Sequence, residues 1–184
     1  MNAFEPTLPP GWEGPLAAAV DAAQWAPNHR RTEPWRFHLL GEEAIRRVCE
    51  LNAELVRAKK GDAAAEKKLQ RWLAMPGWLV CTCVGSGEGL DDPSGKARED
   101  YAACCCAIQN LCLSLHASGL GSKWTTGAVN FADGFKAATG VPDDEYVVGT
   151  IWFGRPAGPT PKPVKKLALV GGGAAGAALL TRHK

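Results

Sequence analysis

The chain has 184 residues and a formal net charge of +2, and 46% of its residues are hydrophobic. This length fits one domain, or one subunit of an intertwined oligomer, and can bury a core without disulfide bonds. The composition is that of an ordinary globular protein. The net charge is too small to indicate nucleic acid or an anionic membrane as a partner, so neither is expected.

The two ends differ in composition from the middle of the chain. Residues 1–14 are rich in Pro and Gly and are predicted to form an extended arm without the pattern of a signal peptide. Residues 157–184 are predicted to be a Pro- and Gly-rich tail. Its apolar run, 167–180, is shorter than the roughly 20 residues that a membrane span needs. We expect this run to lie on the surface or on a partner subunit, with a weak membrane anchor as the alternative.

The first half of the predicted domain, which covers residues 15–156, opens with a helix. Pro15 suits a first helical turn, and apolar residues then recur at helical spacing up to Ala26. Pro27 ends this helix, and a polar loop follows. The alternation of apolar and polar residues over 35–40 predicts a strand. Helices are predicted next, at 42–59 and 63–73.

The second half contains the longest predicted helix. Residues 77–84 are rich in β-branched and aromatic side chains, which indicates a buried strand. A helix is predicted over 96–118, and from Tyr101 to Leu115 it is apolar nearly all round, which indicates burial on every side. One of those sides is expected to form the interface of a homodimer. After a Gly-rich turn, a helix at 131–139 and a strand at 146–153 complete the domain.

The seven cysteines show no metal-binding spacing. The chain has no CxxC pair, and its four histidines do not fall at zinc-ligand distances. Three cysteines are consecutive on a predicted helix, where side chains point about 100° apart and cannot share one ion. We therefore expect no metal, and interpret the thiols as reduced, buried side chains of a cytoplasmic protein.

Motifs of common catalytic sites are also missing. The sequence has no GxGxxG after a strand, no GxxxxGK[ST], no HExxH and no GxSxG. The Gly-rich segment 85–90 is followed by two aspartates and a proline instead of a helix, which favours a loop. Chemistry supplied by a cofactor is therefore the better hypothesis, because a cofactor needs positioning groups more than reactive side chains.

Three segments together indicate which cofactor. They are APNHRRTEPWRF at 26–37, AIQNL followed by GLGSKWTTG within 107–127, and VVGTIWFGRP at 147–156. In order and spacing they resemble the FMN-dependent nitroreductase family, whose members show an APxxxxxQPW-like loop, a buried helix with a QN pair, a GxGxxW turn and a last strand that closes in GxP. The resemblance covers about 16–156 and is closest to short, single-domain members with His in the first loop.

The resemblance implies a fold and an activity. The fold is α+β, a three-layer arrangement with a mixed, mainly antiparallel central sheet flanked by helices, in an intertwined homodimer. The activity is transfer of hydride from NAD(P)H through FMN to a small organic electron acceptor, such as a nitro compound or a quinone. No side chain needs to act as an acid or base in this scheme, so we assign no catalytic residue.

Cofactor-binding residues follow from the same resemblance. In the family, the first loop of one subunit meets the flavin held mainly by the other subunit, and the GxGxxW turn lies along the flavin. These segments correspond here to His29, Arg30 and Glu33 in the loop, and to Trp124, Thr125 and Thr126 in the turn. Thr hydroxyls suit the ring carbonyls, and an indole suits a wall beside a flat ring.

These residues also have simpler interpretations. His29 could be a loop residue that bonds its own backbone, and Trp124 could be a packing aromatic. His38 is interpreted as a surface residue of its strand.

Two departures from the family pattern favour an alternative function. Glu33 stands where Gln is more common, and an ionised Glu can only accept hydrogen bonds. Family members usually open with an Arg-Arg-Ser motif that holds the FMN phosphate, whereas here Phe4 begins a segment that resembles the residues just after it. The missing phosphate motif predicts weak, salt-sensitive flavin binding, and Glu33 would repel anionic reduced flavin. Both departures favour a non-catalytic, dimeric binding or scaffold domain as the alternative.

Overall fold

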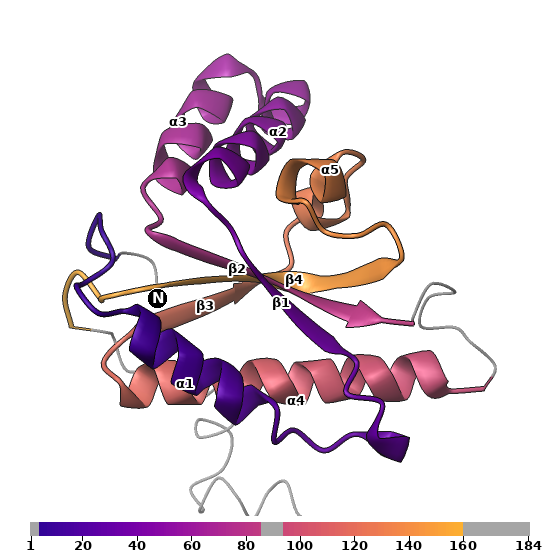
Figure 1. Cartoon of the computed structure of the whole chain (residues 1–184). Helices are drawn as coiled ribbons and strands as arrows, with labels where there is room; N and C mark the ends of the chain where they lie inside the picture. The colour runs from indigo at the N-terminus through magenta and orange to yellow at the C-terminus, as the bar shows by residue number, and fades with distance from the viewer. Residues whose placement is uncertain (1–3, 86–93, 160–184) are drawn as a thin grey trace, which may run out of the picture.

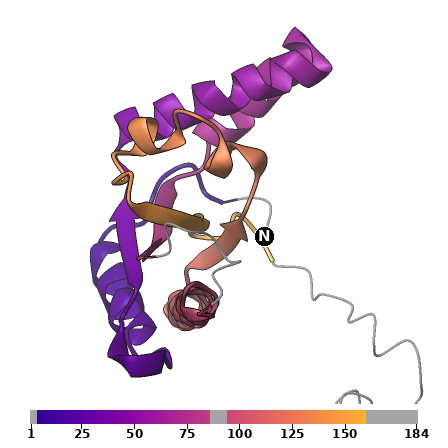
Figure 2. The ribbon, with the colours of Figure 1, turned by 90° about the vertical axis from the view of Figure 1, so that its right-hand side faces the viewer.

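The computed structural model describes residues 4–85 and 94–159, which form three layers (Figure 1). A four-stranded antiparallel sheet lies between α1 and α4 on one face and α2, α3 and α5 on the other. Figure 2 shows the same layers from the side. The elements in chain order are α1 (Glu13–Ala23), the 3-10 turn η1 (His29–Arg31), β1 (Trp35–Leu39), α2 (Glu42–Lys60), α3 (Asp62–Leu73), β2 (Gly77–Val84), α4 (Lys96–Ala117), β3 (Gly121–Thr125), the 3-10 turn η2 (Ala128–Phe131), α5 (Phe135–Thr139) and β4 (Glu145–Gly154).

The strand order is β1-β2-β4-β3, and every neighbouring pair is antiparallel. The expected α+β class with a mainly antiparallel sheet between helices is therefore confirmed. β2 and β4 are the inner strands, and both are buried along almost their whole length. This explains why their sequences read as continuous apolar runs, since each strand has a helical layer on both faces.

One strand was not expected. The GxGxxW segment is predicted to be a turn, but Gly121–Thr125 forms β3 and pairs with β4 from Gly154 to Thr150. A five-residue segment next to two glycines carries a weak local signal for a strand. Its conformation is set by the long partner strand, whose free edge supplies the hydrogen bonds.

The sheet separates two apolar cores because side chains alternate along each strand. Leu79 and Cys81 on β2 face α1 and α4, whereas Trp78 and Val80 face the other helical layer.

The N-terminal arm contacts the sheet, since Phe4 is buried and forms an isolated bridge with Pro156. The limits of the predicted domain stay predictions, and the apolar run of the tail lies outside the described residues.

Two predicted helices need correction. The segment 131–139 is divided into η2 and α5 by Gly134, whose φ of 87° lies in the left-handed region and interrupts the helix. Burial of α4 on every side is wrong for the single chain. Ala107 and Ile108 are fully buried, but Leu113 is 57% exposed and Cys106 is exposed as well. Among the described residues, nothing covers the side of the helix that carries Cys106 and Leu113.

The thiols agree only in part with the interpretation that they are buried, because Cys105 and Cys112 are partly exposed and Cys106 is exposed. All seven cysteines are free, and four are buried. Hydrogen bonding to Cys81 and burial raise the pKa of the Cys104 thiol, and burial raises the pKa of Cys49 to about 12. Both therefore stay protonated near neutral pH and are poor nucleophiles. In 4–85 and 94–159, no group of His, Cys, Asp and Glu side chains is arranged to hold a metal ion.

No helix within the described part of the chain has the length and apolarity that crossing a membrane requires.

Candidate functional site

The first half of the candidate site is the loop between α1 and β1. Its backbone is unusual, because Arg30, Arg31 and Glu33 have φ angles of 57°, 54° and 43°. Residues other than Gly rarely adopt this left-handed backbone conformation, and each one that does destabilises the fold by on the order of 1 kcal/mol or more. Three of them within four positions require a surrounding structure that holds the loop in place.

Side chains inside and beside the loop provide that support. Asn28 accepts a hydrogen bond from the Glu33 N–H at 3.1 Å and donates to the Ala26 carbonyl at 3.3 Å. Arg36 on β1 donates from Nη1 to the Glu33 carbonyl at 3.0 Å. Thr32 donates from its hydroxyl to Asp100 of α4 at 2.7 Å. The loop is therefore fixed to its own strand and to the longest helix before any ligand binds.

Asp100 is the buried anchor of this half, and the sequence interpretation did not identify it. Asp100 is 2% exposed. Its carboxylate accepts hydrogen bonds from Thr32 and from Lys96, which lies one helical turn earlier. A signal was present in the sequence, because an acid on the inner face of an apolar helix needs a partner. A pocket of about 400 Å³ lies here, lined by His29, Arg30, Thr32, Ser94, Lys96, Glu99 and Asp100.

Replacing Asp100 with Ala is expected to destabilise the protein by about 1–3 kcal/mol, because the Thr32 hydroxyl then loses its buried acceptor. The free energy of unfolding from denaturant titration measures the effect. Glu99→Ala is the matched control on the same turn of α4, since Glu99 is exposed and a surface change usually shifts stability by less than about 0.5 kcal/mol. Equal stability of the two variants would show that Asp100 does not anchor the loop.

The predicted His29 and Arg30 are exposed and contact each other. Arg30 Nε donates to His29 Nε2 at 3.2 Å, so the histidine bonds a neighbouring side chain instead of its own backbone. Glu33 is exposed as well. All three side chains stand on the outer surface of a fixed loop, where a ligand or a second subunit can reach them.

The second half of the candidate site lies on β3. Trp124 is 37% exposed, so it is not a core residue. Its ring lies over Gly149 of β4, where an added Cβ would overlap the indole nitrogen. Gly149 thus leaves room for the indole beside the sheet, and part of the Trp124 surface is open to solvent. This arrangement suits a wall for a planar ligand.

Thr125 and Thr126 differ in whether their hydroxyl groups can bind a ligand. Thr125 donates its hydroxyl hydrogen to the Thr150 carbonyl at 3.1 Å, which ties it into the sheet. Thr126 is exposed. Asn130, which is 4% exposed, donates to the Thr125 carbonyl at 2.9 Å and accepts from the Thr150 hydroxyl at 3.2 Å. Asn130 therefore fixes the end of β3, a role that only the structure reveals.

The structure does not bring the two halves together in one chain. The loop precedes β1, Trp124 belongs to β3, and these are the two edge strands. Three strand spacings of about 4.8 Å separate them, or about 14 Å in total. A ligand that contacts both halves would therefore have to lie between two copies of the chain, as the resemblance implies.

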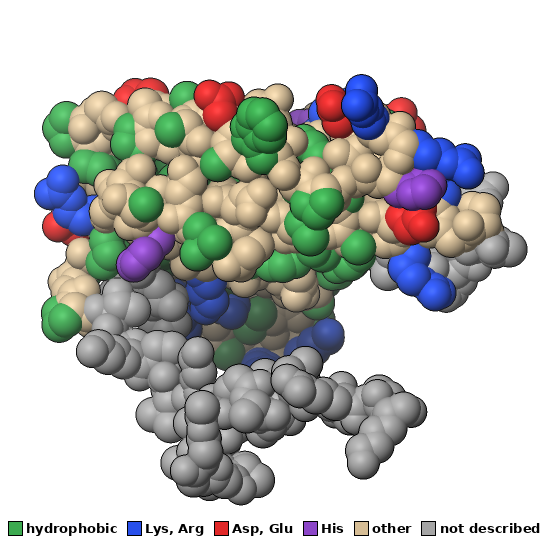
Figure 3. All heavy atoms as spheres, turned by 90° about the horizontal axis from the view of Figure 1, so that it is seen from below, with side chains coloured by type: hydrophobic (Ala, Val, Ile, Leu, Met, Phe, Trp, Pro, Cys, Tyr) green, Lys and Arg blue, Asp and Glu red, His purple; other side chains and the backbone are tan. Residues whose placement is uncertain are grey.

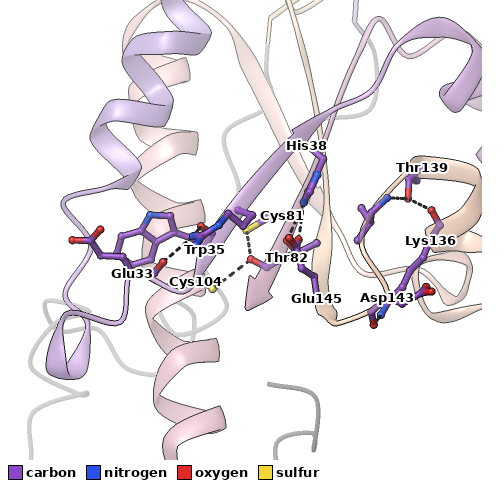
Figure 4. A network of polar contacts seen from close by, with 12 residues as sticks. Glu33, Trp35, His38, Cys81, Thr82, Cys104, Lys136, Thr139, Asp143 and Glu145 are labelled. Carbon is purple, nitrogen blue, oxygen red and sulfur yellow. Dashed lines mark hydrogen bonds and ion pairs between the residues drawn. The ribbon is translucent and has the colours of Figure 1, made fainter. Parts of the chain in front are cut away.

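A polar cluster on the α5 side of the sheet corrects the interpretation of His38 (Figure 4). Its side chain is 25% exposed and lies 2.7 Å from the Glu145 carboxylate, measured from Nε2 to Oε2. Thr82 donates to the same carboxylate. Because these residues come from β1, β2 and β4, the cluster connects three strands, and His38 is partly buried in it instead of being a plain surface residue.

The face formed by α1 and α4 is a candidate surface for a second subunit. Seen from below, this face carries hydrophobic side chains among polar ones (Figure 3). Trp25, just after α1, is 86% exposed, and Leu113 on α4 is 57% exposed. Asn110 of α4 donates to the Ala22 carbonyl at 3.3 Å, so the two helices lie side by side. Large apolar side chains this exposed are typical of an interface.

Comparison with known proteins places these features in a family. A family model described as the nitroreductase family matches residues 13–155. YfhC of Bacillus subtilis strain 168, a candidate NAD(P)H nitroreductase, is 32% identical over 143 residues, which are 74% of this chain and 70% of YfhC.

Solved structures show the same fold. A nitroreductase-like family protein from Bacillus cereus has a TM-score of 0.69 and 29% identity, covering 92% of this chain and 87% of its own. NfnB of Mycobacterium smegmatis, an FMN-dependent nitroreductase crystallised with NADPH, has a TM-score of 0.63 and 17% identity. The match covers 85% of this chain and 82% of NfnB.

Proposed function

Because the chain belongs to the nitroreductase family, we propose that it is a cytoplasmic, homodimeric, FMN-dependent oxidoreductase that takes hydride from NAD(P)H. Its acceptors are small organic molecules such as nitro compounds or quinones. NfnB, which shares the fold, is FMN-dependent and binds NADPH, and YfhC is named for NAD(P)H and nitro compounds. These names support the cofactors and the acceptor class proposed here.

The observation that carries the proposal is the position of Trp124 on Gly149. A half-exposed indole held against the sheet can form one wall for a planar isoalloxazine ring. Thr126 offers an exposed hydroxyl beside it, which can donate to a ring carbonyl. FMN, when bound, supplies the hydride chemistry, and the protein contributes binding, orientation and exclusion of water.

The second subunit completes this site. Its loop would bring His29, Arg30 and Glu33 to the flavin bound at β3 of the first subunit. The loop suits this role because its strained backbone is already held by Asn28 and Asp100. A fixed loop loses little conformational freedom when a ligand binds, which favours affinity.

Purified protein is expected to bind FMN and to oxidise NADH or NADPH in the presence of a nitroaromatic or a quinone. Trp124→Ala should weaken FMN binding by about tenfold, the loss expected when one ring contact of about 1.4 kcal/mol disappears. Thr126→Ala should weaken it as well, while changing the free energy of unfolding by less than about 0.5 kcal/mol because the residue is exposed. Flavin fluorescence titration and thermal unfolding measure the two quantities.

Two results would contradict the proposal. If thermal stability collapses in Trp124→Ala and the folded fraction binds FMN with unchanged affinity, Trp124 is a packing residue. If the wild-type chain binds no flavin and oxidises no NAD(P)H, it is the non-catalytic dimeric binding module that the departure at Glu33 favours.

A further inference from the structure

A pocket of about 420 Å³ lies between η2, α5 and the beginning of β4. Residues 130–137 form one side of it, and Asp143, Tyr146 and Val147 form the other. Its volume falls in the range of sites that bind small molecules. None of the residues assigned to the flavin lines this pocket. It therefore needs a ligand of its own if it has a function.

The walls of the pocket are held in place without a ligand. On the η2 side, Asn130 donates to the Thr125 carbonyl at 2.9 Å and accepts from the Thr150 hydroxyl at 3.2 Å. On the α5 side, Lys136 donates from Nζ to the Asp143 carbonyl at 2.6 Å (Figure 4). A pocket that is already formed loses little conformational freedom when a ligand enters it.

The strand that borders the pocket has an edge without a strand partner. β4 begins at Glu145, but β3 pairs only with its residues 150–154. Tyr146 and Val147, which line the pocket, therefore have no strand neighbour on the side of β3. Such an edge presents backbone N–H and C=O groups. These groups can form hydrogen bonds with polar atoms of a ligand.

Aromatic side chains supply the apolar part of the lining. Phe135 is 1% exposed and belongs to the core, whereas Phe131 is 55% exposed. Tyr146 is partly exposed, and its ring packs edge-on against Tyr101 of α4 with centroids 6.1 Å apart. Burial of an exposed aromatic side chain under a ligand is favourable, because apolar surface leaves water. The pocket therefore suits a ligand that contains a ring.

The charges of the lining indicate the sign of the ligand. Two carboxylates, those of Asp133 and Asp143, stand against one ammonium group, that of Lys136. None of the ion pairs among the described residues involves either aspartate. The lining thus carries a net negative charge, which attracts a cation. Aromatic faces attract cations as well, so the rings and the carboxylates favour the same kind of group.

We propose that this pocket binds a small aromatic amine in its cationic form. The ring packs on Phe131, and the ammonium group lies near Asp133 and Asp143. The inference goes beyond the proposed function, because the pocket residues recognise this ligand whether or not flavin is bound.

The first test compares two probes that share a ring and differ in charge. Tryptamine is a cation at neutral pH, and indolepropionate is an anion. Calorimetric titration should show that the protein binds tryptamine at least about tenfold more tightly. Phe131→Ala should weaken tryptamine binding by about tenfold, the loss expected for one aromatic contact. Leu73→Ala is the matched control, since Leu73 is also exposed but does not line the pocket.

The second test removes the carboxylates. Asp133→Asn/Asp143→Asn should weaken tryptamine binding by about tenfold, because two exposed charge contacts of up to about fivefold each are lost. Its preference for tryptamine over indolepropionate should fall as well. Asp21→Asn/Glu54→Gln is the matched control, since it removes the same charge from exposed positions on α1 and α2. Its affinity for tryptamine should stay within about twofold of the wild type, because distant surface charges are screened by salt.

Three outcomes would overturn the inference. They are a wild type that does not bind tryptamine, equal affinities for the two probes, and equal losses in the two double variants. Trp124→Ala separates this pocket from the proposed flavin site. It should leave the affinity for tryptamine unchanged, and a loss would mean that the probe binds at the flavin wall instead. Absence of FMN binding contradicts only the proposed function.

Discussion

Leu113→Asp is expected to convert the protein to a monomer and to remove most of its FMN binding. Leu113 is 57% exposed on the outer face of α4, so the change should leave the single chain folded. In a symmetric dimer both copies of the new carboxylate would be buried, and each unpaired buried charge costs several kcal/mol. FMN binding should be lost with the dimer, because Trp124 and the loop of His29 lie on opposite edges of the sheet.

Light scattering at micromolar concentration and titration with FMN measure the two effects. Leu73→Asp is the matched control, since Leu73 is 43% exposed on α3, in the other helical layer. It should remain dimeric and retain FMN. A Leu113→Asp protein that stays dimeric would show that this face is not the interface. A monomer that binds FMN as tightly as the wild type would show that one chain forms the whole site.

Gly149→Ala is expected to damage both stability and FMN binding. The new Cβ would overlap the Trp124 indole and would lie 2.9 Å from the Thr125 carbonyl oxygen. Overpacking of this kind costs about 1–3 kcal/mol. The added Cβ would push the indole away from the sheet, into the space proposed for the flavin ring, so FMN affinity should fall by at least about tenfold.

A double-mutant cycle with Trp124→Ala tests this mechanism. If Gly149→Ala acts by displacing the indole, it should cost little further FMN affinity once Trp124 is already Ala. Gly14→Ala in α1 is the control, because its added Cβ would meet nothing within 4 Å and Ala is the better helix former by up to about 1 kcal/mol. Additive losses in the cycle would mean that Gly149 acts on the fold independently of Trp124.

The limits of most helices and strands follow from the sequence because they depend on local signals. Gly61 separates α2 from α3 at the position expected, whereas α1 ends at Ala23, before the expected end at Ala26. The apolar run of β2 indicates burial on both faces, which two helical layers confirm. Each of these features depends on residues close together in the chain. Their conformations are set by backbone sterics and by the spacing at which apolar residues recur.

The sequence by itself also identified the family, since three separated motifs in the right order specify it and the family model matches residues 13–155. Tertiary structure decided the features that depend on residues far apart in the chain. The conformation of β3 depends on the edge that β4 offers, and the loop at Glu33 depends on Thr32 reaching Asp100, which lies 68 positions away. His38 pairs with Glu145 across 107 positions. No local pattern encodes such contacts, because their energy arises only when folding brings both partners out of water together.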